Sequence, residues 1–266
     1  MGNHLIRGAR RAVWLHYLIS LAGLLIWINV DAQVGSDVAL TRSDLIPIDP
    51  KAYLLGQFRP DTTSDFARLP KDLANGRSVY LRTEVAKALE RMIRDAREEG
   101  VHLEVVSATR SFAQQRAIWN AKFTGERLSG GRNLAKEYPD SLERCLAILK
   151  YSSAPGTSRH HWGTDIDFNS TSPAYWRTGE GLLALRWLER HANDYGFFMA
   201  YTPDRDRGYR YEPWHWSYQT IARSLLRNHY HQLISPEDIN GFHGADIFRR
   251  FEWRDWYVDG VSEALR

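Results

Sequence analysis

Residues 83–108 read TEVAKALERMIRDAREEGVHLEVVSA, a helix pattern that runs directly into a strand pattern. In the first part, apolar residues recur every three or four positions, as they do on one face of a helix: Val85, Leu89, Met92, Ile93 and Ala96. Thr83 is a residue type that caps the start of a helix, and Gly100 is one that ends it. The β-branched residues that follow predict a strand over residues 101–108.

Further along the chain, helix and strand patterns mix without a regular order. Helix patterns occupy residues 111–123 and 181–195, and short strand patterns occupy residues 163–169 and 197–202. A strict alternation of strands and helices would predict a parallel sheet, and the sequence does not show that alternation. We therefore expect an α+β fold.

The composition is that of an ordinary globular protein, with 43% apolar and 25% charged residues in a chain of 266. This length allows one large domain, or a compact domain with extensions. A net charge of +3, with basic residues scattered among acidic ones, argues against nucleic acid as a partner. Cys145 is the only cysteine, so an intramolecular disulfide is excluded; its helical surroundings predict a buried structural thiol.

The N-terminus has the pattern of an export segment. Arg7, Arg10 and Arg11 precede the nearly uncharged apolar run 12–30, and the small residue Ala32 follows. Such a pattern is typical of a cleaved signal peptide, but the run is also about long enough to span a bilayer as a helix. We expect residues 1–32 to be a signal peptide or an N-terminal membrane anchor, and the protein to be exported to the periplasm or the extracytoplasmic face of the membrane.

Proline and aromatic residues mark the remaining boundaries. Residues 33–80 contain several prolines, which predict an irregular lead-in. Residues 233–266 begin with a helix-capping pattern at Ser235 and are rich in aromatic side chains, which we expect to pack on the main domain. Residues 81–232 between them are the predicted catalytic domain.

Metal-ligating residue types concentrate in the segment SRHHWGTDIDF, residues 158–168. Histidine and carboxylate side chains are ligands of zinc, and a catalytic zinc site needs three of them and an open position. Local chemistry alone leaves four candidates in this segment: His160, His161, Asp165 and Asp167.

A second candidate pair lies in YEPWHW, residues 211–216. Glu212 and His215 cannot belong to the helical zinc motif of metalloproteases, because Pro213 would break the helix. Residues three apart on a regular strand face opposite sides, so these two side chains converge only if the chain bends at Pro213.

Together with SATRSFAQQ (residues 107–115), these segments resemble the VanY-type D-alanyl-D-alanine carboxypeptidases, zinc peptidases that trim peptidoglycan stem peptides. The family pattern Ser-x-x-Arg-Ser-x-x-x-Gln matches Ser107, Arg110, Ser111 and Gln115. Its pattern Ser-x-His-x-x-Gly-x-x-x-Asp matches Ser158, His160, Gly163 and Asp167, and its pattern Glu-x-x-His matches Glu212 and His215. The order and spacing of all three patterns, over about residues 80–220, make the resemblance specific.

The resemblance implies a role for eight of the ten matched residues. His160, Asp167 and His215 are expected to bind one Zn2+ per chain and to leave the fourth position to water. Glu212 is expected to accept the proton of that water and pass it to the leaving amine, and Arg110 to face the developing oxyanion. Three further motif positions are expected to contact substrate: Ser107, Gln115 and Ser158.

Three residues of these segments fall outside the implied roles. Asp165 stands where many family members have a small residue; it could orient a ligand histidine through the free ring nitrogen or accept local backbone hydrogen bonds, and both interpretations stay open. His161 is expected to be a packed or solvent-facing histidine. Ser217 replaces a common arginine, a change that bears on substrate specificity more than on the zinc site.

The resemblance implies an exported, monomeric enzyme that removes the terminal D-alanine from peptidoglycan stem peptides ending in D-Ala-D-Ala. It also implies the small mixed or antiparallel sheet, flanked by helices, of the hedgehog- and lysostaphin-type zinc peptidases. The alternatives are a peptidoglycan endopeptidase with the same zinc site and a zinc-containing binding module without activity. Glu212 and Arg110 argue against the second alternative, and the chain lacks the Ser-x-x-Lys motif of the serine enzymes with the same substrate.

Overall fold

The computed structural model of this chain describes residues 49–266. The predicted signal peptide or membrane anchor, residues 1–32, lies outside the described residues. Within the described part of the chain, no helix is both long and apolar enough to cross a membrane.

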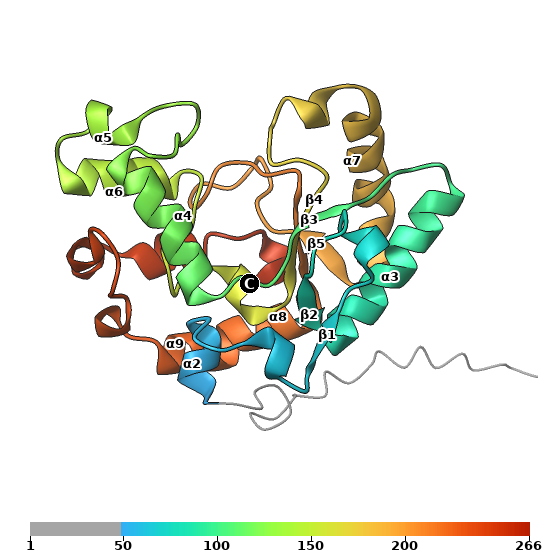
Figure 1. Cartoon of the computed structure of the whole chain (residues 1–266), viewed down its shortest axis with the longest axis horizontal. Helices are drawn as coiled ribbons and strands as arrows, with labels where there is room; N and C mark the ends of the chain where they lie inside the picture. Colours follow the sequence, from blue (N-terminus) through green and yellow to red (C-terminus); the bar gives the residue numbers. More distant parts are fainter. Residues whose placement is uncertain (1–48) are drawn as a thin grey trace, which may run out of the picture. The chain divides into compact units, whose positions relative to one another are not determined.

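A four-stranded antiparallel sheet forms the centre of the described chain (Figure 1). Its strands lie in the order β3 (Val105–Ser107), β4 (Asp165–Phe168), β6 (His215–Tyr218) and β5 (Phe197–Met199). Each neighbouring pair in this order is antiparallel. The predicted α+β class with a small antiparallel sheet is confirmed.

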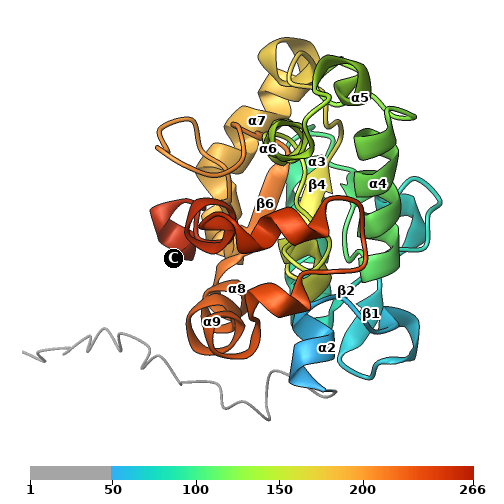
Figure 2. The same ribbon diagram turned by 90° about the vertical axis from the view of Figure 1, so that its left-hand side faces the viewer.

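Helices cover the sheet on both sides. In Figure 1, α3 and α7 lie to one side of the sheet, and α4, α5 and α6 lie to the other. Figure 2 is viewed from the side of the second group, with α4 and α5 to the right of β4. The helices are α2 (Pro50–Leu54), α3 (Thr83–Glu98), α4 (Phe112–Thr124), α5 (Leu134–Glu137), α6 (Ser141–Leu149), α7 (Gly179–His191), α8 (Gln219–Leu225) and α9 (His231–Leu233).

The apolar stripe of α3 faces the core as its periodicity predicts. All five residues of the stripe are buried: Val85, Leu89, Met92, Ile93 and Ala96. The predicted cap is wrong, because Thr83 is already the first helical residue and Arg82 occupies the N-cap position. The Thr83 hydroxyl instead donates to the carbonyl oxygen of Asp65 at 3.1 Å, which ties the helix start to the preceding segment.

The segment predicted as an irregular lead-in contains regular structure. Strand β1 (Phe66–Arg68) pairs antiparallel with β2 (Tyr80–Arg82), which leads directly into α3. The four prolines of this region do not interrupt the pairing, since none of them lies within either strand.

The aromatic residues of the C-terminal segment pack mainly inward. Phe248 and Trp253 are buried, whereas Trp256 is 52% exposed. Trp119 of α4 meets this segment, because its ring nitrogen donates to the carbonyl oxygen of His243 at 2.9 Å and its ring lies 5.6 Å from that of Phe242. The C-terminal segment therefore supports the helix that forms one wall of the site described next.

Candidate active site

Strand β4 places two carboxylates on one side of the sheet. Asp165 and Asp167 are two residues apart, so their side chains point the same way. In the register between β4 and β6, Asp165 lies opposite Ser217 and Asp167 lies opposite His215. The imidazole of His215 lies between the carboxylates, with Nε2 3.0 Å from Oδ1 of Asp165 and Nδ1 3.1 Å from Oδ1 of Asp167.

His160 completes a cluster of three buried side chains. Potential ligand atoms of His160, Asp167 and His215 all lie within 4.8 Å of one another. His160 belongs to a short 3-10 turn, Arg159–Trp162, just before β4. Its Nδ1 is 2.9 Å from the carbonyl oxygen of Ala108, and its Nε2 is 3.4 Å from Oδ2 of Asp167.

The chemistry of this cluster fits a metal ion. Nε2 of His160 and Oδ1 of Asp167 are buried and make no hydrogen bond of good geometry, although each lies close to another side chain of the cluster. Buried polar atoms of this kind need an explanation such as an ion. Burial alone would lower the pKa of His215, but the carboxylates of Asp165 and Asp167 raise it to about 9. Surroundings that favour a positive charge at this imidazole also suit a bound cation.

A tight turn brings Glu212 to the same cluster. The N–H of His215 donates to the carbonyl oxygen of Glu212 at 3.1 Å, so residues 212–215 form a β-turn with Pro213 at its second position. Oε2 of Glu212 thereby lies 3.6 Å from Nδ1 of His215. The chain therefore bends at Pro213, and the side chains of Glu212 and His215 converge as the bend requires.

Glu212 has the properties of a proton acceptor near neutral pH. Burial raises the pKa of its carboxyl to about 7, and the Asp167 carboxylate adds to the rise, while His215 and Arg110 oppose it. A general base is most effective when its pKa is near the working pH.

Arg110 also lies close to Asp167. Its Nη2 is 3.9 Å from Oδ2 of Asp167, and its Nη1 donates to Oε1 of Gln115 at 2.9 Å. Gln115 is buried and donates from Nε2 to the carbonyl oxygen of Ser153 at 2.7 Å. Both ends of the Gln115 amide are therefore engaged, and the residue orients the guanidinium of Arg110.

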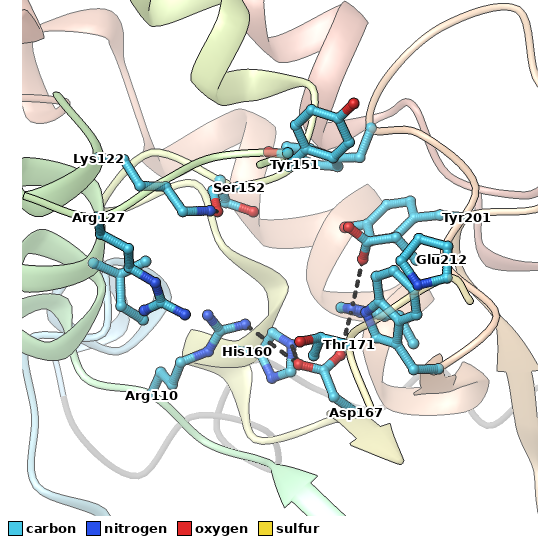
Figure 3. Close-up of a pocket in the computed structure, with 17 residues that line it drawn as sticks. Arg110, Lys122, Arg127, Tyr151, Ser152, His160, Asp167, Thr171, Tyr201 and Glu212 are labelled. Atoms are coloured by element: carbon cyan, nitrogen blue, oxygen red, sulfur yellow. Dashed lines mark hydrogen bonds and ion pairs between the residues drawn. The ribbon is translucent and has the colours of Figure 1, made fainter. Parts of the chain in front are cut away.

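The cavity that these residues line has a volume of about 440 Å3 (Figure 3): Arg110, His160, Asp167, Glu212 and His215. Figure 3 shows Arg110 on one side of it and Glu212 on the other, with His160 and Asp167 between them. A volume of this order is typical of a small-molecule site. The cavity thus combines a candidate metal site, a carboxyl with a raised pKa and a guanidinium.

Comparison with known proteins agrees with this geometry. A sequence model of VanY, described as D-alanyl-D-alanine carboxypeptidase, matches residues 78–221, more than half of the chain. The chain belongs to the VanY family.

Individual relatives resemble it more distantly. A Bacillus subtilis protein named as a carboxypeptidase, YodJ, is 33% identical over 52% of this chain and 46% of its own length. A D-alanyl-D-alanine carboxypeptidase of Enterococcus faecalis is 28% identical over 63% of this chain and 58% of its own length. The chain therefore spans about half the length of the curated relatives that it matches. A solved structure of VanYB in complex with D-alanine-D-alanine is 23% identical, with a TM-score of 0.48 over 82% of this chain and 98% of that chain.

One departure from the common VanY pattern has a structural counterpart. Asp165 is fully buried and accepts hydrogen bonds from three side chains besides its contact with His215: Arg159 at 3.1 Å, Thr164 at 2.5 Å and Ser217 at 3.0 Å. Arg159 also donates to the Ser217 hydroxyl at 2.7 Å. Of the two interpretations left open for Asp165, the structure shows the contact with a candidate ligand histidine. Ser217 belongs to the same buried network and does not line the cavity.

His161 is a packed histidine. It is fully buried; its Nδ1 lies 2.7 Å from the carbonyl oxygen of Arg110, and its Nε2 lies 3.1 Å from the N–H of Gly156, which donates to it. Burial lowers the pKa of this imidazole to about 3, so the ring is neutral. Both nitrogens are occupied, which leaves neither for a metal.

The three residues predicted to contact substrate lie elsewhere than the cavity wall. Gln115, Ser107 and Ser158 are absent from its lining among the described residues. Ser107 lies opposite Asp167 in the pairing of β3 with β4, and Ser158 is buried at the start of the turn that contains His160. Ser107 and Ser158 thus adjoin the candidate ligands Asp167 and His160 in the fold, and Gln115 contacts Arg110.

Other residues that line the cavity belong to none of the three motifs. Tyr201 follows β5, and its ring lies 4.6 Å from that of His215. Lys122 extends from α4 into the cavity. A sequence signal for Lys122 exists, because Gln115, Trp119 and Lys122 have the spacing of one helix face, and all three are buried. A lysine on a buried helix face is unusual and marks the position.

Proposed function

We propose that this chain is a zinc-dependent carboxypeptidase that removes the C-terminal D-alanine from peptidoglycan stem peptides. The observation that supports it most is the convergence of His160, Asp167 and His215 in one cavity with Glu212 and Arg110. Membership of the VanY family supports the choice of substrate.

The ligand set suits zinc. Two imidazole nitrogens and one carboxylate leave a fourth position open, which is the composition of a catalytic site. Zinc bound there would supply a water of lowered pKa, near about 7, and a Lewis acid for the scissile carbonyl.

Glu212 is the residue that moves protons in this proposal. It accepts a proton from the attacking water, because its carboxylate lies beside the ligand cluster and its pKa of about 7 leaves much of it ionised at neutral pH. It then gives that proton to the nitrogen of the departing D-alanine. A positioned group of this kind typically contributes about 10²–10⁴-fold in rate.

Arg110 holds the carbonyl oxygen in this proposal. Gln115 fixes its guanidinium at the cavity wall, so a donor is already oriented before the negative charge develops. Loss of one such donor typically costs on the order of 10²–10³-fold in turnover.

We further propose that the protein acts outside the cytoplasm, since its substrate is part of the cell wall. The basic and apolar pattern of residues 1–32 supports export.

The decisive experiment uses the full chain loaded with zinc and a synthetic stem pentapeptide that ends in D-Ala-D-Ala. Mass spectrometry should show loss of one D-alanine, and chelation should abolish the reaction until zinc is restored. A cross-linked stem dimer, tested in parallel, identifies an endopeptidase if an internal bond is cut instead. Full activity in the chelated, zinc-free protein would refute the proposal.

A further inference from the structure

Lys122 brings a buried positive charge into the cavity. The residue is only 8% exposed, and its Nζ donates to the hydroxyl of Ser152 at 2.5 Å. Neither Lys122 nor the nearby Arg127 forms an ion pair with a carboxylate of the described chain. A buried ammonium is costly unless an anion compensates it.

The cation-rich wall lies opposite the proton acceptor. Figure 3 shows Lys122, Arg127 and Arg110 on one side of the cavity and Glu212 on the other. Arg127 and Arg110 repel the charge on Lys122 and, after burial, contribute to lowering its pKa to about 8. The cavity lining thus has three cationic side chains and two carboxylates, Asp167 and Glu212. This excess of positive charge favours a ligand that carries a negative charge.

We propose that Lys122, assisted by Arg127 at the cavity rim, binds the C-terminal carboxylate of the substrate. This inference rests on the proposed carboxypeptidase activity and names the residue that selects a free chain end. The terminal carboxylate is one residue from the scissile bond, and a residue spans about 3.5 Å. Lys122 and Glu212 line the same cavity of about 440 Å3, so a ligand bound there can meet both side chains.

The same charge disfavours an endopeptidase. A chain that continued past the scissile bond would present a neutral amide to Lys122, which leaves the ammonium buried without an anion. An enzyme discriminates in this way when the wrong ligand leaves a buried charged or polar group of the site without a partner. Lys122 thus acts as a specificity-determining residue.

The test compares two stem pentapeptides that differ only at the end, one with a free carboxylate and one with a C-terminal amide. The full-length zinc enzyme, Lys122→Met and Lys122→Arg are assayed on both. Lys136→Met is the matched control, since Lys136 is an exposed lysine of α5 that does not line the cavity. Zinc content and thermal midpoint show whether each variant is folded and loaded.

We expect the free acid to be strongly preferred by the wild type and by Lys136→Met. In Lys122→Met, kcat/KM for the acid should fall about 10- to 100-fold, the usual range for a hydrogen bond to a charged group. Most of this loss should be in KM, the value for the amide should stay near wild type, and Lys122→Arg should retain part of the preference.

A binding measurement tests the preference for the free acid without any turnover of the peptide. In the Glu212→Gln background, calorimetry should show tighter binding of the acid than of the amide, and Lys122→Met should abolish the difference. A folded Lys122→Met that keeps its preference for the acid overturns the inference while the carboxypeptidase activity stands. A wild type that cuts neither peptide instead refutes the proposed function.

Discussion

Nε2 of His215 lies 3.0 Å from Oδ1 of Asp165, so a fully buried carboxylate faces the ring nitrogen opposite the ligand cluster. Burial alone would raise the pKa of Asp165, but Arg159 and His215 hold it below its ordinary value, and the group stays ionised. An ionised partner fixes the tautomer and the orientation of a metal-binding imidazole. His215 therefore presents Nδ1 to the cavity.

Substitution of Asp165 should weaken the metal site without removing it. Asp165→Asn should lower zinc affinity or turnover about 10- to 100-fold, and Ser217→Ala, which removes one donor to Asp165, should have a smaller effect. Zinc affinity measured with a competing chelator checks both. Unchanged affinity and turnover in a folded Asp165→Asn would contradict a positioning role.

Substitution of a candidate ligand, unlike that of Asp165, should remove the metal. His160→Ala and Asp167→Ala should each lose zinc during dialysis, because two protein ligands are too few for a catalytic site. His161→Ala should keep the metal and lose stability, since both of its ring nitrogens bond to the backbone. Zinc per chain decides the matter, and retention by Asp167→Ala would show that this carboxylate is not a ligand.

Glu212→Gln should separate metal binding from turnover. The substituted amide keeps the size of the side chain but cannot accept a proton, so kcat should fall about 10²–10⁴-fold while the bound zinc remains. Rates and metal content are measured on the same preparation. Loss of zinc in a folded Glu212→Gln would make Glu212 a ligand.

Substrate binding should weaken at alkaline pH. Burial, with Arg127 and Arg110, lowers the pKa of Lys122 to about 8, and Glu212 opposes the shift. Below that pH Lys122 is charged and attracts a carboxylate; above it the charge is lost. KM for the free-acid pentapeptide should therefore rise several-fold between pH 8 and pH 9. Lys122→Met should lack this rise, and an identical rise in both proteins would assign it to another group.

Cys145 should be inert in the folded protein. The thiol is fully buried, and burial raises its pKa to about 12, whereas the thiolate is the reactive form. A thiol reagent should label less than a tenth of the chains before denaturation and about one thiol per chain after it. Rapid labelling of the native protein would mean that α6 opens readily.

Periodicity and motif spacing predict different parts of this molecule. The stripe on α3 is predictable because burial of one helix face leaves a direct trace in the order of residues. The cap at Thr83 is not, because its hydroxyl bonds to Asp65, a partner that only the folded chain provides. The pairing of β1 with β2 is also not predictable, because three-residue strands are too short to show an alternation of polar and apolar residues.

The candidate site likewise has features that the sequence predicts and features that only the folded chain shows. The family spacing places His160, Asp167 and His215 among the candidates, but the convergence of Glu212 with His215 depends on a turn that strand geometry alone does not give. Motif spacing also gives no information on two residues of α4: Gln115 accepts a hydrogen bond from Arg110 and does not line the cavity, and Lys122, which belongs to no motif, enters it. Both follow from how α4 is rotated against the sheet, which tertiary packing decides.

The turn at residues 212–215 also matters for protein design. It joins a proton acceptor and a metal ligand through four consecutive residues, and Phe168 of β4 secures it by donating to the carbonyl oxygen of Trp214 at 3.0 Å. A designer who transplants this chemistry can therefore move Glu212–His215 as one cassette, but the recipient scaffold must supply an antiparallel neighbour in the register of β4. An insertion anywhere within these four residues would retain Glu212 and His215 but separate their side chains, because one backbone hydrogen bond between the two residues sets that separation.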